Sequence, residues 1–317
     1  MTMQRPIHNE IPLSEIPLTY IRLHFSIRAV DSMQLGKYPA MTIRGGLGYA
    51  MQQLACECRS KQHDADCLYA KMYEEKQGET VEDTYIPYVR PFVIHTGVNE
   101  LHTYTKHMTY QFSITLFGQA TKAYDLFILA MQHFGEAGIG EKKSPFTVVE
   151  VKAEQHHMSQ LVFHQNRLLR IPAPQRIADQ PLLPADVYVR FTTPLRLQVQ
   201  GKNQHVVTLP ELFQNIVRRL RSLLYFHCEG YYLPSSVEEV LLRYAERATI
   251  EEADFYYVQY KRFSTRQKNM QRIDGTEGSF YAYDLHEVLV QLLLIGQVMH
   301  VGKQTVFGLG RYEVSVF

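Results

Sequence analysis

Residues 301–312 have the sequence VGKQTVFGLGRY, with glycines at Gly302, Gly308 and Gly310 and cations at Lys303 and Arg311. Glycine permits positive φ angles and a close approach of the backbone to a ligand. Backbone amides that converge in such a turn, beside cations, suit an anionic group such as a phosphate. We therefore predict a glycine-rich, anion-binding loop between a strongly apolar helix and the last strand.

A weaker copy of this loop lies in the middle of the chain. The sequence FGEAGIG, residues 134–140, also follows an amphipathic segment and precedes an apolar one, Phe146 to Val151. Two glycine loops at equivalent positions indicate a duplicated domain.

The first half of the chain has the pattern of one βαββαβ unit. Side chains from Tyr20 to Val30 alternate between apolar and polar, which predicts a strand with one buried face. Thr42 is expected to cap a helix in which Leu47, Ala50, Met51 and Leu54 recur at helical spacing. Further strands are predicted over 85–96, 109–118 and 146–151, and a second helix over 126–134. This order is that of the ferredoxin-like unit.

The second half repeats that order. The predicted elements are a strand over 187–199, a helix over 212–224, an extra helix over 237–248, a hairpin over 255–263 and 270–283, a helix over 285–299 and a strand over 311–317. We therefore predict an α+β protein of two tandem ferredoxin-like (RRM-like) βαββαβ domains, 1–170 and 171–317, with the glycine-rich loop near the C-terminus.

Composition narrows the classes of partner. The 317 residues carry a formal net charge of only +1, so any nucleic-acid surface must be local rather than a global basic field. There is no apolar run of about 18 residues, and the N-terminus lacks the pattern of a signal peptide. The sequence therefore predicts a cytoplasmic protein without a membrane segment.

Three of the four cysteines lie close together in sequence. In a cytoplasmic chain of this size we expect no disulfide framework. Cys56, Cys58, His63 and Cys67 offer four side chains that bind zinc, but the Cys-x-Cys spacing is tighter than the gap of about two to four residues usual in structural sites. We therefore expect free thiols and no metal or cofactor, with zinc at these four residues as the alternative.

A predicted hairpin combines cations with aromatic residues. Residues 255–273 contain no Asp or Glu, five cations (Lys261, Arg262, Arg266, Lys268 and Arg272) and five aromatic residues. Cations contact phosphates and aromatic faces stack on unpaired bases, so the pattern favours an RNA-binding hairpin. The alternative is a set of core aromatics beside a solvated basic face. On the preceding helix, Arg218, Arg219 and Arg221 indicate a solvated face, or else a second patch for the RNA backbone.

One histidine stands directly before the glycine loop. His300 has an ordinary pKa near neutrality, which suits a general acid or base beside a bound phosphate. The alternative is a partly buried histidine that bonds to the backbone. The sequence has no Walker A motif, no Gly-x-Ser-x-Gly elbow and no paired acidic cluster for two metals. A nuclease would therefore use metal-free acid–base chemistry.

The motifs together resemble a known family, the CRISPR-associated RAMP endoribonucleases that cut precursor CRISPR transcripts into guide RNAs. The resemblance is strongest over 187–317, in FTTPLR at 191–196, in Ser264-x-Arg266-Gln267, and in the stretch from His300 to Tyr312. RGGLG at 44–48, RPF at 90–92 and GIG at 138–140 are similar too. The tandem ferredoxin-like fold that this resemblance implies agrees with the duplication.

The resemblance implies a metal-independent endoribonuclease for CRISPR repeat RNA. The ribose 2′-hydroxyl would attack the adjacent phosphate, leaving a 2′,3′-cyclic phosphate and a 5′-hydroxyl. His300 would be the acid or base, Lys303 and Arg266 would stabilise charge, and Tyr38 would orient the ribose or share proton transfer. The implied RNA-binding residues are Lys261, Arg262, Arg266, Gln267, Lys268, Gln304, Gly308, Gly310 and Arg311. The implied partners are the repeat RNA, as precursor and guide, and subunits of a CRISPR effector complex, with no direct DNA contact and no membrane.

Two other functions stay open. Many members of the family carry a catalytic histidine in the first helix or the loop before it, whereas here no histidine lies between His24 and His63 and the loop offers Lys37, Tyr38 and Arg44. A non-catalytic RNA-binding RAMP subunit of an effector complex is therefore the first alternative. The second is a small-molecule-binding protein of the same fold, which predicts an enclosed apolar pocket.

Overall fold

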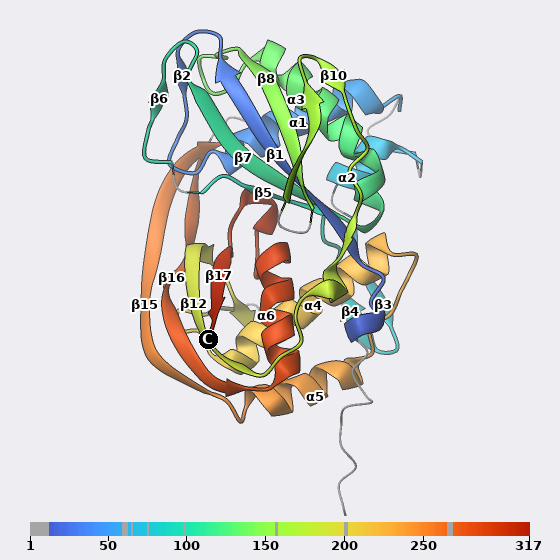
Figure 1. The fold of residues 1–317 in the computed structure, drawn as a ribbon, viewed down its shortest axis with the longest axis vertical. Coiled ribbons are helices and arrows are strands. Elements are labelled where there is room, and N and C mark those ends of the chain that lie inside the picture. Colours follow the sequence, from blue (N-terminus) through green and yellow to red (C-terminus); the bar gives the residue numbers. More distant parts are fainter. Residues whose placement is uncertain are drawn as a thin grey trace, which may run out of the picture.

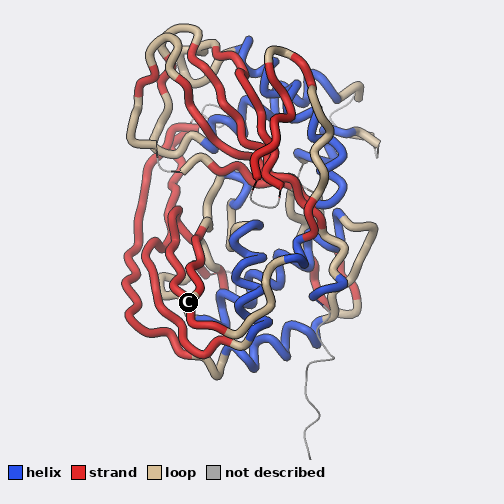
Figure 2. The backbone as a smooth tube through the Cα atoms, viewed as in Figure 1, coloured by secondary structure: helices blue, strands red, loops and turns tan. Residues whose placement is uncertain are grey.

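The computed structural model describes residues 13–58, 63–64, 66–74, 76–97, 99–155, 158–199, 202–264 and 269–317. Two antiparallel sheets, each with its own helices, lie one above the other along the long axis of the molecule (Figure 1). Figure 2 shows that the strands and helices of the lower half form separate layers. We refer to the half built on the upper sheet as the first domain and to the half built on the lower sheet as the second domain.

The first domain has the strand order β10-β9-β8-β1-β7-β5. The strands are β1 (Thr19–Ala29), β5 (Phe92–His95), β7 (Thr109–Phe117), β8 (Phe146–Gln155), β9 (Met158–His164) and β10 (Arg167–Leu168), and the helices are α1 (Ala40–Ala55), α2 (Leu68–Tyr73) and α3 (Tyr124–Ala137). Short pairs flank the sheet: β2 (Met33–Gln34) with β6 (Thr103–Tyr104), β3 (Glu79–Val81) with β4 (Thr84–Ile86), and β11 (Gln175–Arg176) with the start of β1.

The second domain has the order β15-β16-β12-β17. Its strands are β12 (Ala185–Leu195), β15 (Thr249–Ser264), β16 (Asn269–Leu285) and β17 (Tyr312–Val316), its helices are α4 (Leu209–His227), α5 (Ser235–Ala245) and α6 (Glu287–Met299), and β13 (Gln198–Val199) pairs with β14 (Lys202–Asn203). In both domains the first strand of the βαββαβ unit lies between the third and the fourth. The α+β, tandem ferredoxin-like fold is thus confirmed.

Side-chain periodicity explains how the layers form. On β1, the apolar side chains of Ile21, Leu23, Phe25 and Ile27 are buried in the first domain's core. Helix α4 begins where the Thr208 hydroxyl accepts a hydrogen bond from the Glu211 amide, and it packs its leucine-rich stripe against α6. Helix α6 is apolar on nearly every side because the second domain encloses it.

Some local expectations were wrong. Thr42 does not cap α1: the helix begins at Ala40, after Pro39, and Thr42 lies inside it. The strand expected over 85–96 is divided into β4 and β5, in a segment that contains Pro87 and Pro91, which have no amide hydrogen to donate to a ladder. The boundary at 170/171 stays a prediction, although β11 still pairs with the first sheet. No helix among the described residues is long and apolar enough to cross a membrane.

Candidate functional site

The glycine-rich loop lies at the junction of the two domains. The Gly310 amide donates to the Pro194 carbonyl at 3.0 Å, and the Thr193 hydroxyl donates to the Gly308 carbonyl at 2.9 Å. Gly308 has a φ angle of +80° and Gly310 one of +68°, both positive. A Cβ on Gly308 would lie 2.7 Å from the Ile94 carbonyl oxygen of β5, and a Cβ on Gly310 would overlap the loop's own backbone. Glycine is therefore needed at 308 for close packing between the domains and at 310 for the conformation of the loop itself.

This packing changes the expected role of the loop amides. The Gly308 amide donates to the Thr305 carbonyl in the turn formed by the 3-10 helix Thr305–Phe307, and the Arg311 amide donates to the Thr193 hydroxyl. These amides, with that of Gly310, already have acceptors within the protein and do not converge on an open anion site. Contact of Gly308 and Gly310 with RNA stays a prediction.

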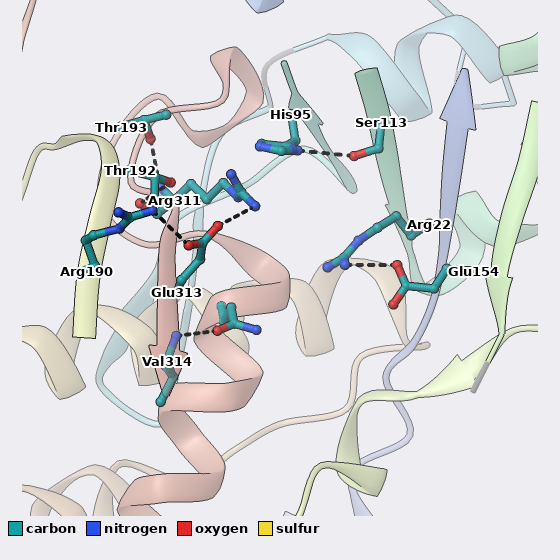
Figure 3. A network of polar contacts seen from close by, with 11 residues as sticks. Arg22, His95, Ser113, Glu154, Arg190, Thr192, Thr193, Arg311, Glu313 and Val314 are labelled. Atoms are coloured by element: carbon teal, nitrogen blue, oxygen red, sulfur yellow. Dashed lines mark hydrogen bonds and ion pairs between the residues drawn. The ribbon is translucent and has the colours of Figure 1, made fainter. Parts of the chain in front are cut away.

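A polar cleft of about 480 Å³ opens between the first sheet and the end of α6. The residues that line it include Arg22, His24, Ser26, His95, Ser113 and Lys152 from the first domain and Gln297, His300, Arg311 and Glu313 from the second. Figure 3 shows Arg22 and Glu154 on one side of this space and Arg311 and Glu313 on the other. Because the lining is polar and charged, the cleft is unlike the enclosed apolar pocket that a small-molecule-binding protein would have.

Two histidines from different domains meet in this cleft. His300 directly follows α6, is only 3% exposed, and has its ring centroid 6.1 Å from that of His95. Burial, with His95 and Arg219 nearby, holds the pKa of His300 well below its ordinary value. Burial, with Arg311 nearby, lowers the pKa of His95 to about 3. Both rings are therefore neutral at pH 7, and their burial opposes protonation.

The polar atoms of these rings are only partly satisfied. Ser113 Oγ and His95 Nδ1 form a hydrogen bond of 3.4 Å, which is visible in Figure 3. Within the described parts of the chain, His95 Nε2 and His300 Nδ1 have no hydrogen-bond partner. Buried polar nitrogens normally have a hydrogen-bond partner. These two nitrogens could therefore accept a hydrogen bond from a hydroxyl group, or from a protonated anion, of a molecule that enters the cleft.

The cations of the cleft are held by carboxylates. Arg22 Nη1 lies 3.1 Å from Glu154 Oε2, Lys152 Nζ lies 2.7 Å from Glu150 Oε1, and Arg311 Nη2 lies 3.0 Å from Glu313 Oε1. A hydrogen bond to His24, with Arg22 nearby, lowers the pKa of Glu154 to about 2, so this carboxylate is charged. A phosphate that enters the cleft must therefore compete with these pairs.

Tyr38 lies in a different cluster. Its hydroxyl donates to Glu277 Oε1 at 3.4 Å, and its ring centroid is 4.9 Å from that of Tyr260. Lys37 Nζ is 4.1 Å from the centre of the Tyr260 ring, in a cation–π contact. Burial, together with Tyr260 and Glu277, raises the pKa of Tyr38, so its phenol stays protonated. The cluster joins the start of α1 to the β15–β16 hairpin.

The structure thus separates the three predicted catalytic residues. His300 lies in the cleft, whereas Tyr38 and Lys303 are not among the described residues that line it. Lys303 and Gln304 are exposed at the tip of the glycine loop, and Arg311 lies in the cleft. For the hairpin, Arg266, Gln267 and Lys268 lie outside the described residues, as do the side chains of Lys261 and Arg262 on β15.

Both interpretations of the arginine-rich helix were wrong for two of its three arginines. Arg219 and Arg221 are only 7% and 3% exposed. Arg219 Nε donates to the Met299 carbonyl at 2.9 Å, and Arg221 Nε donates to the Leu233 carbonyl at 2.8 Å. These side chains tie α4 to the end of α6 and to the segment before α5, so they form neither a solvated face nor an RNA patch.

The sequence also left two cleft residues unassigned, Arg22 and His95. Arg22 belongs to the polar face of β1, which was expected to meet solvent and instead faces the second domain. His95 ends a buried strand and is paired with a residue far along the chain. A polar residue at the end of an otherwise apolar strand was the only local signal for it.

Comparisons with known proteins agree with this architecture. Residues 18–176 match a family model described as an N-terminal domain, AF_1859_N, and residues 189–312 match the model of the CRISPR-associated endoribonuclease Cas6. None of the curated proteins is significantly similar to the chain in sequence.

Solved structures share the tandem fold at low sequence identity. A chain of a partial Cas6-RT-Cas1–Cas2 complex matches with a TM-score of 0.61 and 13% identity, over 95% of this protein and 47% of that chain. A Cas6 product complex matches with a TM-score of 0.58 and 14% identity, over 94% and 99%. Thermus thermophilus Cas6 matches with a TM-score of 0.55 and 12% identity, over 94% and 99%. The protein therefore spans about half of the first of these chains and nearly all of the other two.

The fold and the loop at the domain junction define a tandem ferredoxin-like protein, with two βαββαβ domains and a C-terminal glycine-rich loop. The match of residues 189–312 to the model of the CRISPR-associated endoribonuclease Cas6 makes the second domain similar to that family.

Proposed function

We propose that the protein is a metal-independent endoribonuclease that acts in the cytoplasm and cleaves CRISPR repeat RNA into mature guide RNAs. The observation that supports this proposal is the Cas6 match over 189–312, on a fold whose two domains both align with Cas6 structures. Its RNA partner is the repeat, as precursor and as product, and its protein partners are subunits of a CRISPR effector complex.

The reaction requires only proton transfer and charge stabilisation. A base takes the proton of the 2′-hydroxyl, the 2′-oxygen bonds to phosphorus, and the bond to the 5′-oxygen breaks as that oxygen takes a proton. The products are a 2′,3′-cyclic phosphate and a 5′-hydroxyl. His300 is neutral, as a base must be, but burial lowers its pKa, so the negative charge of a bound phosphate would have to stabilise its protonated form. The protonated phenol of Tyr38 suits a donor that orients the ribose, and Lys303 suits the developing negative charge.

These catalytic roles require the scissile phosphate of the RNA to bind at different places. Catalysis by His300 requires the scissile phosphate to enter the cleft between the domains. Catalysis by Tyr38 requires the phosphate to lie at the start of α1, beside the β15–β16 hairpin. The exposed position of Lys303 leaves it free to meet RNA from outside the cleft.

A second candidate function is a non-catalytic RNA-binding subunit of a CRISPR effector complex. It is favoured by the enclosure of His300, which is 3% exposed, and by the separation of His300 from the cluster of Tyr38. An acid and a base that do not face one phosphate give binding without cleavage.

The test is cleavage of the host's repeat RNA by purified protein in EDTA. Wild type is compared with His300→Ala and Tyr38→Phe, and with His102→Ala and Tyr85→Phe as exposed controls. Loss of one acid–base group should slow cleavage about 10²- to 10⁴-fold, while the controls cut normally. Melting temperatures separate loss of chemistry from loss of fold.

Each result has a definite meaning. Cleavage by wild type only after Mg²⁺ is added would contradict the metal-independent mechanism. Tight binding without cleavage by any of the proteins would favour the non-catalytic subunit. Cleavage that survives in His300→Ala and fails in Tyr38→Phe would place the chemistry at the start of α1.

A further inference from the structure

Four side chains that bind zinc converge where α1 ends and α2 begins. The Sγ atoms of Cys56, Cys58 and Cys67 and a ring nitrogen of His63 all lie within 4.8 Å of one another. Cys56 directly follows α1, and Cys67 directly precedes α2. We propose that this cluster is a structural zinc site with three thiolate ligands and one imidazole ligand. The sequence had favoured free thiols at these positions.

The distances between the donor atoms suit a tetrahedral ion. His63 Nδ1 lies 3.3 Å from Cys56 Sγ and 3.6 Å from Cys67 Sγ. Around a tetrahedral zinc, with Zn–S of about 2.3 Å and Zn–N of about 2.0–2.1 Å, sulfur and nitrogen ligands are about 3.5 Å apart and two sulfurs about 3.8 Å apart. These two spacings match a tetrahedral site, and because all four donor atoms lie within 4.8 Å of one another, small movements of the side chains would close the cluster on one ion.

The groups around the cluster hold its ligands in the orientation that a metal requires. His63 turns Nδ1 toward the thiols and Nε2 toward Glu74 Oε1, 3.9 Å away. Histidine ligands commonly direct their second ring nitrogen at a carboxylate, which fixes the tautomer that binds the metal. The Asp64 amide donates to Cys58 Sγ at 3.4 Å, a bond that stabilises a thiolate.

The backbone explains why the tight Cys-x-Cys spacing is compatible with zinc. At Cys56 the chain leaves the helix and becomes extended, with φ −113° and ψ 111°. In an extended chain, residues two apart project to the same side. Cys56 and Cys58 can therefore share one ion without the longer gap of a helical or turn-based pair. A disulfide would use only two of the three sulfurs and would leave His63 directed at them without a role.

The site would fix a helix that is too short to be stable alone. Helix α2 has six residues, well below the length of about 12–15 residues at which isolated helices become marginal. Its Tyr73 hydroxyl donates to the Arg44 carbonyl at 2.7 Å, and the Arg44 guanidinium lies 5.0 Å from the ring centre of Phe307 in the glycine-rich loop. Zinc would thus brace the contact between α2, α1 and that loop.

Metal content gives the first test. Protein purified from zinc-supplemented medium should contain one zinc ion per chain by elemental analysis, and Cys56→Ser and Cys67→Ser should lose it. Cys228→Ser is the matched control, because Cys228 follows α4 and lies outside the cluster. Equal zinc in Cys56→Ser and Cys228→Ser would overturn the proposal.

Cobalt gives a test that needs no variant. Full-length wild type, stripped of metal and titrated with Co²⁺, should show thiolate-to-cobalt charge-transfer absorption and the strong visible bands of tetrahedral Co²⁺, and Zn²⁺ should displace both. The weak spectrum of six-coordinate Co²⁺ with no charge-transfer band would overturn the proposal, whatever the folding of the cysteine variants.

Discussion

The imidazole rings of His95 and His300 meet edge to face, with their centroids 6.1 Å apart. His95 ends β5 in the first domain, and His300 follows α6 in the second, so the pair lies across the domain junction. Protonation of either ring would place a positive charge beside Arg311 in a partly enclosed site. Protonation of either ring would therefore weaken the contact between the domains.

This pair predicts a loss of stability in acid. The folded pKa of His95 is about 3 and that of His300 is well below its ordinary value, whereas the unfolded imidazoles titrate near about 6.5. Below that pH the unfolded chain binds more protons, so the stability present above it falls progressively as the pH drops toward about 3. Each histidine contributes at most about 1.4 kcal/mol per pH unit in this window.

The measurement is urea unfolding of wild type, His95→Gln and His102→Ala at about pH 7.5 and about pH 5. His95→Gln should lose less stability between the two pH values than wild type does, because glutamine does not titrate. The exposed His102 should make no difference. The same pH dependence in all three proteins would contradict a neutral His95 in the folded state.

The arginines of α4 predict a contrast between neighbours on one helix. Arg221 is buried, donates to the Leu233 carbonyl and pairs with Glu238 at 2.9 Å, whereas the Arg218 side chain is 47% exposed and lies 3.6 Å from the same carboxylate. Arg221→Ala should destabilise the protein by about 3 kcal/mol, because it leaves buried acceptors unpaired. Arg218→Ala should change stability by less than about 1 kcal/mol. Urea midpoints that shift equally would show that the burial of Arg221 is unimportant.

Periodicity was sufficient to predict the layers of this fold but not its polar contacts. The alternation on β1 and the apolar stripe of α4 are local patterns, and each specified its element and buried face. The environment of a polar side chain depends on what packs against it from elsewhere in the chain. The helical pattern of α4 is therefore compatible with an Arg221 side chain exposed to solvent and with a buried one. It is buried because α5 and the segment before it pack over it.

In the candidate site, too, some features follow from local sequence and others depend on the packing of distant parts of the chain. The glycine loop and His300 were found from local sequence, because glycine spacing and a flanking histidine are visible there. The partnership of His300 with His95, and its separation from Tyr38, depend on how the two domains stack. For the cysteines, spacing alone argued against zinc, whereas the extended backbone at Cys56 brings the ligands together.

The glycine loop predicts a sensitive position at the domain junction. Gly310 has φ +68°, and any Cβ there would overlap the Val301 carbonyl oxygen. Gly310→Ala should therefore cost more than the roughly 1–2 kcal/mol of the left-handed conformation alone. Gly45→Ala is the control, because Gly45 is exposed on α1 with open space around its Cα and should gain up to about 1 kcal/mol. Thermal unfolding of the two variants in opposite directions is the expected result, and a stable Gly310→Ala would contradict the packing.

The cleft predicts opposite effects of its two paired side chains on RNA binding. Glu154 holds Arg22 at 3.1 Å, so Glu154→Gln should free this cation and strengthen binding of repeat RNA, while Arg22→Gln should weaken it. Each change should be about 1 kcal/mol, or roughly fivefold. Loss of one phosphate contact in Arg22→Gln should also reduce the slope of log K against log salt by about 0.7–0.9.

Fluorescence anisotropy at several salt concentrations measures both quantities, with Glu136→Gln as the control, since Glu136 is exposed on α3. Affinities and slopes that match wild type in both Arg22→Gln and Glu154→Gln would mean that the RNA backbone does not enter the cleft. His300 would then have no access to a scissile phosphate, and the proposed chemistry would belong to Tyr38 and the exposed Lys303. Opposite shifts in the two variants would instead place RNA beside His95 and His300, where the negative charge of the phosphate would favour the protonated form of an imidazole that takes the 2′-proton.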